Sequence, residues 1–171
     1  AAMEFLPLTP GGQTPLRVMT IAGSDSGGGA GIQADMRTFA LLGMHACVAV
    51  TAVTVQNSMG VKGFHEIPVE VIAGQIGAVA SDIGIQAAKT GMLASSAIIA
   101  TVADTWRAQG LAGVVPFVVD PVCASMHGDP LLHPDITAPG VRIVSARSST
   151  GVVAPLGITS DLNACNIGFQ N

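Results

Sequence analysis

Aromatic side chains are scarce in this sequence: among 171 residues there is no tyrosine, one tryptophan and five phenylalanines. Without aromatic platforms on which bases stack, binding of single-stranded nucleic acid is not expected. Charged residues are also few, at 11%, and the net charge of -4 comes with no basic run. The chain therefore has no electrostatic source of affinity for a nucleic-acid backbone, and nucleic acid is excluded as an expected partner.

Long apolar runs are absent too, because no stretch of about 18 uninterrupted apolar residues occurs, and no membrane span is expected. Residues 1–16 lack the basic segment of a signal peptide and are predicted to form a flexible leader. The three cysteines, Cys47, Cys123 and Cys165, have neither metal-site spacing nor an even count for pairing, which suits a reducing cytoplasm. The four histidines are scattered, so no zinc site is predicted.

What the chain does contain is apolar residues, at 49%, and 21 glycines, which favours one domain built on a sheet buried on both faces. Apolar runs alternate with helical patterns, and this alternation predicts a parallel sheet with right-handed crossovers. Strands are expected at 18–22, 46–56 (central in the sheet), 83–90 and 114–120, with a loop or short irregular strand at 58–65. Helices are expected at 36–42, at 69–82 after Pro68, and from Ser95 or Ser96 to about 108.

A glycine-rich turn at 23–31 joins the first expected strand to the first helix. It has no lysine, so it is not a phosphate-binding P-loop, and the acid of a dinucleotide fingerprint is missing after the next strand. Free N–H groups at a helix N-terminus favour an anion or a polar acceptor. A turn that merely joins two elements is the alternative, but Asp25 and Asp35 bracket this one in a charge-poor stretch.

Polar residues also gather where the expected strands end: Asp25, Gln56, Lys89 and Asp120. Each has a simpler explanation, since Lys89 could neutralise a carboxylate, Gln56 could satisfy loop backbone and Asp120 could begin a turn. Because the carboxyl ends of parallel strands meet at one edge of a sheet, together they predict a site there. A buried Asp120 carboxylate is expected to suit a divalent cation.

Four segments in order carry a resemblance to a known family: 18–35, 51–57, 89–94, and 119–122 followed by 128–132. They resemble the hydroxymethylpyrimidine/phosphomethylpyrimidine kinases of thiamine biosynthesis, the ThiD family. The likeness covers about 17–136 and is nearest in wording to actinobacterial, especially mycobacterial, members. It implies an α/β fold, namely the N-terminal portion of a ribokinase-like αβα three-layer sandwich with a mostly parallel sheet.

The resemblance also implies ATP- and Mg²⁺-dependent phosphorylation of the pyrimidine hydroxymethyl group and then of the resulting monophosphate. By motif, Gln56 would hydrogen-bond the aminopyrimidine, and the glycine-rich turn would face the pyrimidine rather than an anion. The pocket would be lined by backbone near Ala30 and Thr54 and by the side chains of Met92 and Val122. Asp35 would help to set the pocket from the start of the first helix, and Asp120 would lie near the metal and the phosphates.

The family pattern is expected to span residues 17–138, and residues 139–171 depart from it. The tail lacks the Thr-Pro-Asn and Lys-Gly-Gly segments and the glycine-rich anion hole that would hold the catalytic base, so the catalytic residue stays unassigned. We therefore expect a substrate half without a nucleotide half, no measurable ATP-dependent phosphorylation, and a homo-oligomer such as a dimer. A pyridoxal kinase-like enzyme and a non-catalytic pyrimidine-binding or dimerisation fragment remain alternatives, although Gln56 and Met92 favour the pyrimidine.

Overall fold

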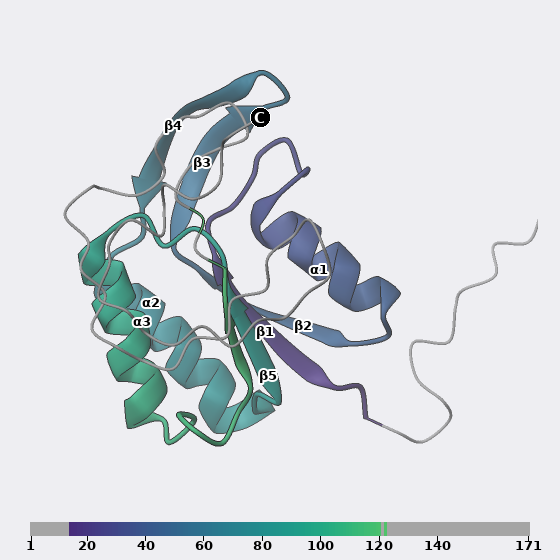
Figure 1. The fold of residues 1–171 in the computed structure, drawn as a ribbon, viewed down its shortest axis with the longest axis vertical. Helices are drawn as coiled ribbons and strands as arrows, with labels where there is room; N and C mark the ends of the chain where they lie inside the picture. Colours follow the sequence, from purple (N-terminus) through teal and green to yellow (C-terminus); the bar gives the residue numbers. More distant parts are fainter. Residues whose placement is uncertain (1–13, 121, 123–171) are drawn as a thin grey trace, which may run out of the picture.

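A four-stranded parallel sheet in the order β2-β1-β5-β6 forms the centre of the protein, and a two-stranded antiparallel sheet, β3-β4, projects from one end of it (Figure 1). These elements belong to a computed structural model, which describes residues 14–120 and 122. Their bounds, in chain order, are β1 Arg17–Ala22, α1 Gly31–Leu41, β2 His45–Val50, β3 Ala52–Asn57, β4 Gly60–Glu66, α2 Val69–Ala78, the π-helical turn η1 Val79–Ile83, β5 Ala87–Thr90, α3 Ser96–Ala108 and β6 Phe117–Val119.

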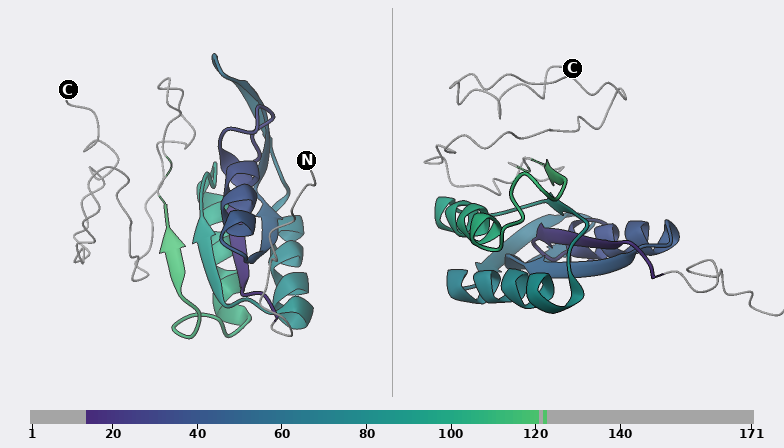
Figure 2. Two further views of the ribbon diagram at one scale, coloured as in Figure 1. Left: turned by 90° about the vertical axis from the view of Figure 1, so that its right-hand side faces the viewer. Right: turned by 90° about the horizontal axis from the view of Figure 1, so that it is seen from below.

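Helices cover both faces of the parallel sheet. Lys89 of β5 is paired with Val118 of β6, so the two side chains share one face, and Lys89 bonds Asp35 of α1 there. Phe117 precedes Val118 and points the opposite way, where its ring centroid lies 4.6 Å from that of Trp106 on α3. Helix α1 therefore lies on one face and α3, with α2 packed beside it, on the other (Figure 2). This arrangement confirms the expected αβα layers.

The hydrophobic core lies mainly on the α2/α3 face. Its largest fully buried apolar side chains come from β1, α2 and α3: Met19, Ile21, Ile72, Ile76 and Ile98. Burying one such side chain stabilises a fold by about 1.5–3 kcal/mol. Helix α1 contributes no fully buried residue, so the opposite face holds the polar contacts described below.

The segment 46–56 is not one central strand, because the chain leaves the parallel sheet at Thr51. The Thr51 N–H donates to Ala22 O at 3.0 Å, and its carbonyl accepts from Ile67 N at 2.9 Å. Its buried hydroxyl donates to Met92 O at 2.7 Å. These bonds fix the chain between β2, at an edge of the described sheet, and β3, in the hairpin.

The other boundaries differ less from expectation. The expected loop or irregular strand at 58–65 is a turn at 58–59 followed by the strand β4, which pairs with β3. Strand β5 begins only at Ala87, because η1 occupies 79–83 and Gly84 turns the chain with φ 79°. Helix α1 begins at 31 instead of 36, and β6 covers only 117–119 of the expected 114–120. Pro68 sits at the N-cap of α2, one position earlier than expected. Ser95 is the N-cap of α3, but its hydroxyl donates to Glu66 Oε2 at 2.8 Å and does not cap the helix.

Cys47 is a free, buried thiol. Burial raises its pKa, and the charge of Arg17 opposes that shift in part. Over residues 14–120 and 122, no helix combines the length and the apolar character needed to cross a membrane. Cys123, Cys165, most of the expected leader and the whole segment 139–171 lie outside the described residues.

Gly31 is predicted to tolerate no side chain. Its φ is 57°, and a Cβ placed there would lie 2.5 Å from Gly23 O. Gly31→Ala should lower the free energy of unfolding by more than about 2 kcal/mol, since left-handed strain alone costs about 1–2 kcal/mol. Urea denaturation measures the change. As a control, Gly74→Ala in α2, where a Cβ meets nothing within 4 Å, should stabilise by about 0.5–1 kcal/mol. Equal effects of the two substitutions would contradict this account.

Candidate functional site at the carboxyl ends of the strands

The glycine-rich turn folds around the Asp25 carboxylate. The Gly27 N–H donates to Asp25 Oδ1 and the Ala30 N–H to Asp25 Oδ2, each at 2.8 Å, while the Asp25 N–H donates to Gln33 Oε1 at 2.8 Å. The residue is only 5% exposed. An internal carboxylate thus takes two of the turn's amides, those of Gly27 and Ala30, so these two are not available to an external anion.

Two serines attach the turn to β3. Ser24 Oγ accepts from the Thr54 N–H at 3.2 Å, and the Thr54 hydroxyl donates to Ser24 O at 2.8 Å. Ser26 Oγ accepts from the Gln56 N–H at 2.8 Å and donates to Gln56 O at 2.6 Å. The serine side chains take the place of a neighbouring strand and hold Thr54 and Gln56 beside the turn. The side chains of Thr54 and Gln56 also approach each other, with Oγ1 and Oε1 3.4 Å apart.

Met92 meets the turn at its first residue. A Cβ placed on Gly23 would lie 3.4 Å from Met92 Sδ and 3.5 Å from Ala52 O. Because glycine has no side chain, the turn can pack closely against both Met92 and the start of β3. Met92 is buried, and Ala94 shortly after it has φ 62°, a left-handed conformation that is uncommon without glycine. The structure therefore brings Met92, Thr54 and Gln56 to the same turn that ends at Ala30.

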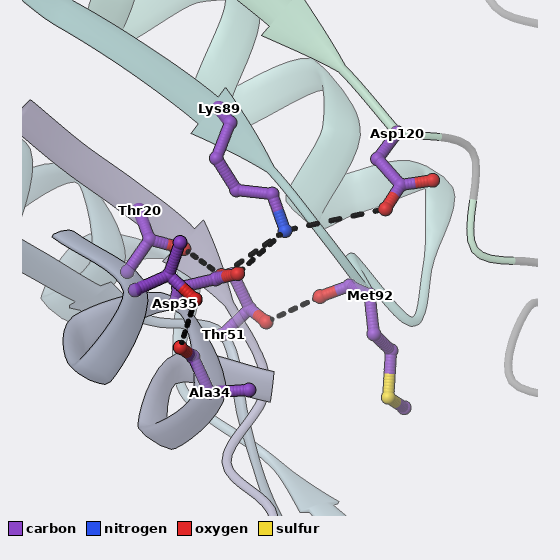
Figure 3. A network of polar contacts seen from close by, with 8 residues as sticks. Thr20, Ala34, Asp35, Thr51, Lys89, Met92 and Asp120 are labelled. Atoms are coloured by element: carbon purple, nitrogen blue, oxygen red, sulfur yellow. Dashed lines mark hydrogen bonds and ion pairs between the residues drawn. The ribbon is translucent and has the colours of Figure 1, made fainter. Parts of the chain in front are cut away.

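A charged cluster lies beside α1, formed by side chains from α1, β5 and the residue that follows β6 (Figure 3). Lys89 Nζ lies 3.1 and 3.0 Å from the two carboxylate oxygens of Asp35 and 4.0 Å from Asp120 Oδ2. The Thr20 hydroxyl donates to Asp35 Oδ2 at 2.6 Å. Asp35 is thus held by a cation and a hydroxyl, whereas Asp120 makes one long ion pair.

Exposure separates the two carboxylates. The Asp35 side chain is 19% exposed, and the Asp120 side chain is 50% exposed. The expectation that Asp120 is buried is therefore wrong, because it follows β6, the short edge strand of the described sheet, and half of its side chain is exposed. Val122, which donates its N–H to Asp120 O at 2.9 Å, is partly buried against the core.

The sequence indicated some of these contacts and missed others. The suggestion that Lys89 neutralises a carboxylate is confirmed by its ion pair with Asp35. The roles of Thr20, Ser24 and Ser26 were missed, although a hydroxyl inside the apolar run 18–22 was a signal for a buried polar partner. No sequence pattern indicated the roles of the two serines, because their partners, Thr54 and Gln56, lie about 30 residues further along the chain.

The family model for phosphomethylpyrimidine kinase matches residues 25–145 of this sequence. The chain belongs to that family. A hydroxymethylpyrimidine/phosphomethylpyrimidine kinase of Mycobacterium tuberculosis is 75% identical over 132 residues, which are 77% of this chain and 47% of the relative. The chain therefore spans about half the length of the curated relatives that it matches.

Solved structures agree with this assignment. A phosphomethylpyrimidine kinase from Clostridium difficile superposes with a TM-score of 0.63 at 41% identity, covering 70% of this chain and 50% of the other. A pyridoxal kinase from Staphylococcus aureus in complex with ADP superposes with a TM-score of 0.56 at 37% identity, covering 64% and 40%. The ribokinase-like fold expected from the resemblance is confirmed for this N-terminal portion.

The role of Asp25 predicts a large effect of its removal. Asp25→Ala leaves the Gly27 and Ala30 amides without their carboxylate and should lower the free energy of unfolding by roughly 2–4 kcal/mol. Asp82→Ala removes the same charge from an exposed position and should change stability by less than about 0.5 kcal/mol. Chemical denaturation of both variants measures this, and a near-neutral Asp25→Ala would show that the turn does not depend on the carboxylate.

Proposed function

We propose that this chain is the substrate-binding portion of a cytoplasmic small-molecule kinase. Its reaction would transfer the γ-phosphoryl group of ATP to 4-amino-5-hydroxymethyl-2-methylpyrimidine and then to the resulting monophosphate. Membership of the phosphomethylpyrimidine kinase family supports this reaction. The observation that carries it is the convergence of Thr54, Gln56 and Met92 on one turn whose amides already bind a carboxylate. Such a site suits an uncharged heterocycle better than a phosphate.

The side chains at the turn have the chemistry that an aminopyrimidine needs. The Gln56 amide offers a donor and an acceptor together, which matches a ring nitrogen beside an amino group. Met92 supplies an adaptable apolar wall. In this proposal the backbone near Ala30 and Thr54 and the Val122 side chain complete the pocket, with Asp35 setting its charged side.

Asp120 fits a magnesium ion only as a single protein ligand. Magnesium in kinases is often bound by one or two carboxylates together with substrate phosphates. Residues 14–120 and 122 contain no group of three or more acidic, histidine or cysteine side chains that could hold a metal on their own. Asp120, half exposed, is thus suited to a Mg²⁺ that arrives with ATP, where the ion would neutralise phosphate charge.

A second candidate is a pyridoxal kinase-like activity, favoured by the superposition on the Staphylococcus aureus enzyme. A third is a module that binds the pyrimidine or dimerises without catalysis. Calorimetric titration of the 171-residue chain with the pyrimidine and with pyridoxal separates the first two. A phosphorylation assay with ATP and Mg²⁺ separates a catalyst from a binding module, and lack of binding to the pyrimidine would refute the proposed function.

Gln56→Ala should weaken pyrimidine binding by roughly 1–3 kcal/mol, because a buried polar group of the ligand loses its partner. Gln109→Ala, at the exposed end of α3, is the matched control and should leave the affinity unchanged. Isothermal titration of the two variants against the original chain measures the difference. Equal affinities for all three proteins would remove Gln56 from the site.

The hairpin supports the proposal of a homo-oligomer. Val53 and Val55 of β3 are 49% and 61% exposed, and Met59 at the tip is 82% exposed. Val53 and Val55 are two positions apart on β3 and therefore share one face of the hairpin. A two-stranded sheet has little stability of its own in water. Exposed apolar patches of this kind mark surfaces that associate.

We therefore expect the chain to be a dimer or larger, and to bind a hydrophobic dye if the hairpin face stays uncovered. Val55→Glu should shift it towards the monomer, because association would bury an unpaired charge. Val114→Glu, at a loop position that is 78% exposed, should not. Size exclusion with light scattering tests both variants. A monodisperse, dye-silent monomer of the unaltered chain would rule out this surface as an interface.

A further inference from the structure

The ammonium group of Lys89 contacts both carboxylates of the charged cluster, those of Asp35 and Asp120. It bonds both oxygens of Asp35 and lies 4.0 Å from Asp120 Oδ2, beyond hydrogen-bond distance. The side chain is 23% exposed and comes from β5, which is paired on both sides in the sheet. The backbone therefore fixes the base of the side chain, and Asp35 fixes its end.

We propose that Lys89 is a positioning residue that competes with a divalent cation for Asp120. While no divalent cation is bound, the positive charge of Lys89 partly neutralises the Asp120 carboxylate. When a cation binds to Asp120, Lys89 keeps its ion pair with Asp35. This rests on the proposed function only in taking Asp120 as the cation ligand. The consequence is that Asp120 binds a divalent ion weakly by itself and needs the phosphates of a nucleotide to hold it.

The unequal distances support this division of roles. Asp35 is held at 3.0 and 3.1 Å by Lys89 and at 2.6 Å by the Thr20 hydroxyl, so its two oxygens are already occupied. Asp120 is more exposed and has the longer contact with Lys89, so a cation can reach it from solvent without displacing the inner pair.

The direction in which Lys89 changes the affinity for a divalent cation follows from the charges in the cluster. The cluster has one positive and two negative charges, and a divalent ion on Asp120 must approach the Lys89 ammonium. Even with the full dielectric screening of water, a monovalent and a divalent cation about 5 Å apart repel enough to weaken binding by about tenfold. Removing the ammonium should therefore strengthen cation binding, and loss of structure cannot produce that gain.

The test is titration of the 171-residue chain with Mn²⁺, a probe for Mg²⁺, followed by the electron paramagnetic resonance signal of the free ion, without nucleotide or pyrimidine. Lys89→Met should bind Mn²⁺ about tenfold more tightly than the unaltered chain. Lys89→Arg keeps the positive charge and should bind Mn²⁺ with the same affinity as the unaltered chain. Lys62→Met removes the same charge from an exposed position on β4 and should change affinity by less than about twofold. If Lys89→Met leaves the protein unfolded by circular dichroism, Lys89→Gln replaces it with the same expectation.

A second substitution identifies the ligand. Asp120→Asn in the Lys89→Met background should return Mn²⁺ binding to the level of the unaltered chain or below it. A gain that persists in this double variant would place the cation on Asp35 and overturn the proposal, as would equal affinity of Lys89→Met and the unaltered chain, or an equal gain in Lys62→Met. Because no pyrimidine is used, failure of pyrimidine binding would count against the proposed function and leave this result intact.

Discussion

The site depends on how closely the chain folds back on itself between β1 and α1. A Cβ on Gly31 would meet Gly23 O at 2.5 Å, and the turn between them is held by two amide bonds to Asp25. This turn places Ser24 and Ser26 where they bond to β3. It also sets the direction in which α1 runs along the sheet. The position of Gln56 and that of Asp35 are therefore two consequences of the same turn.

The unequal filling of the two faces explains why a charged cluster can lie against the sheet. The α2/α3 face carries the large side chains, such as Met19 and Ile21 from β1. On the α1 face the next position of the same strand is Thr20, whose hydroxyl is used by Asp35. A fully buried carboxylate would be costly, but Asp35 has a cation and a hydroxyl as partners and keeps some exposure. Polar groups thus replace apolar packing where α1 meets the sheet.

The sequence predicted the layers, the parallel sheet and the gathering of polar residues at the strand ends, because these follow from apolar periodicity and the alternation of elements. It failed where tertiary contacts override that periodicity. The run 46–56 is uniformly β-forming, and only the bonds of Thr51 to Ala22 and Ile67 divide it between two sheets. Likewise, the exposure of Asp120 follows from its place after the edge strand of the described sheet, and the order of strands in a sheet is a tertiary property that no local pattern encodes.

The two ends of the site differ in charge, and this difference limits what each can bind. At the turn, Asp25 consumes backbone donors and adds its own negative charge, so a phosphate placed there would be repelled, whereas a neutral ring would find the amide of Gln56 and the thioether of Met92. At the other end, Asp35 and Asp120 outnumber Lys89, and the cluster keeps one net negative charge. A phosphate approaching Asp120 therefore gains little from Lys89, whose charge is already shared. In the proposed function a phosphate would have to bring a cation with it, so that metal and nucleotide would bind at Asp120 together.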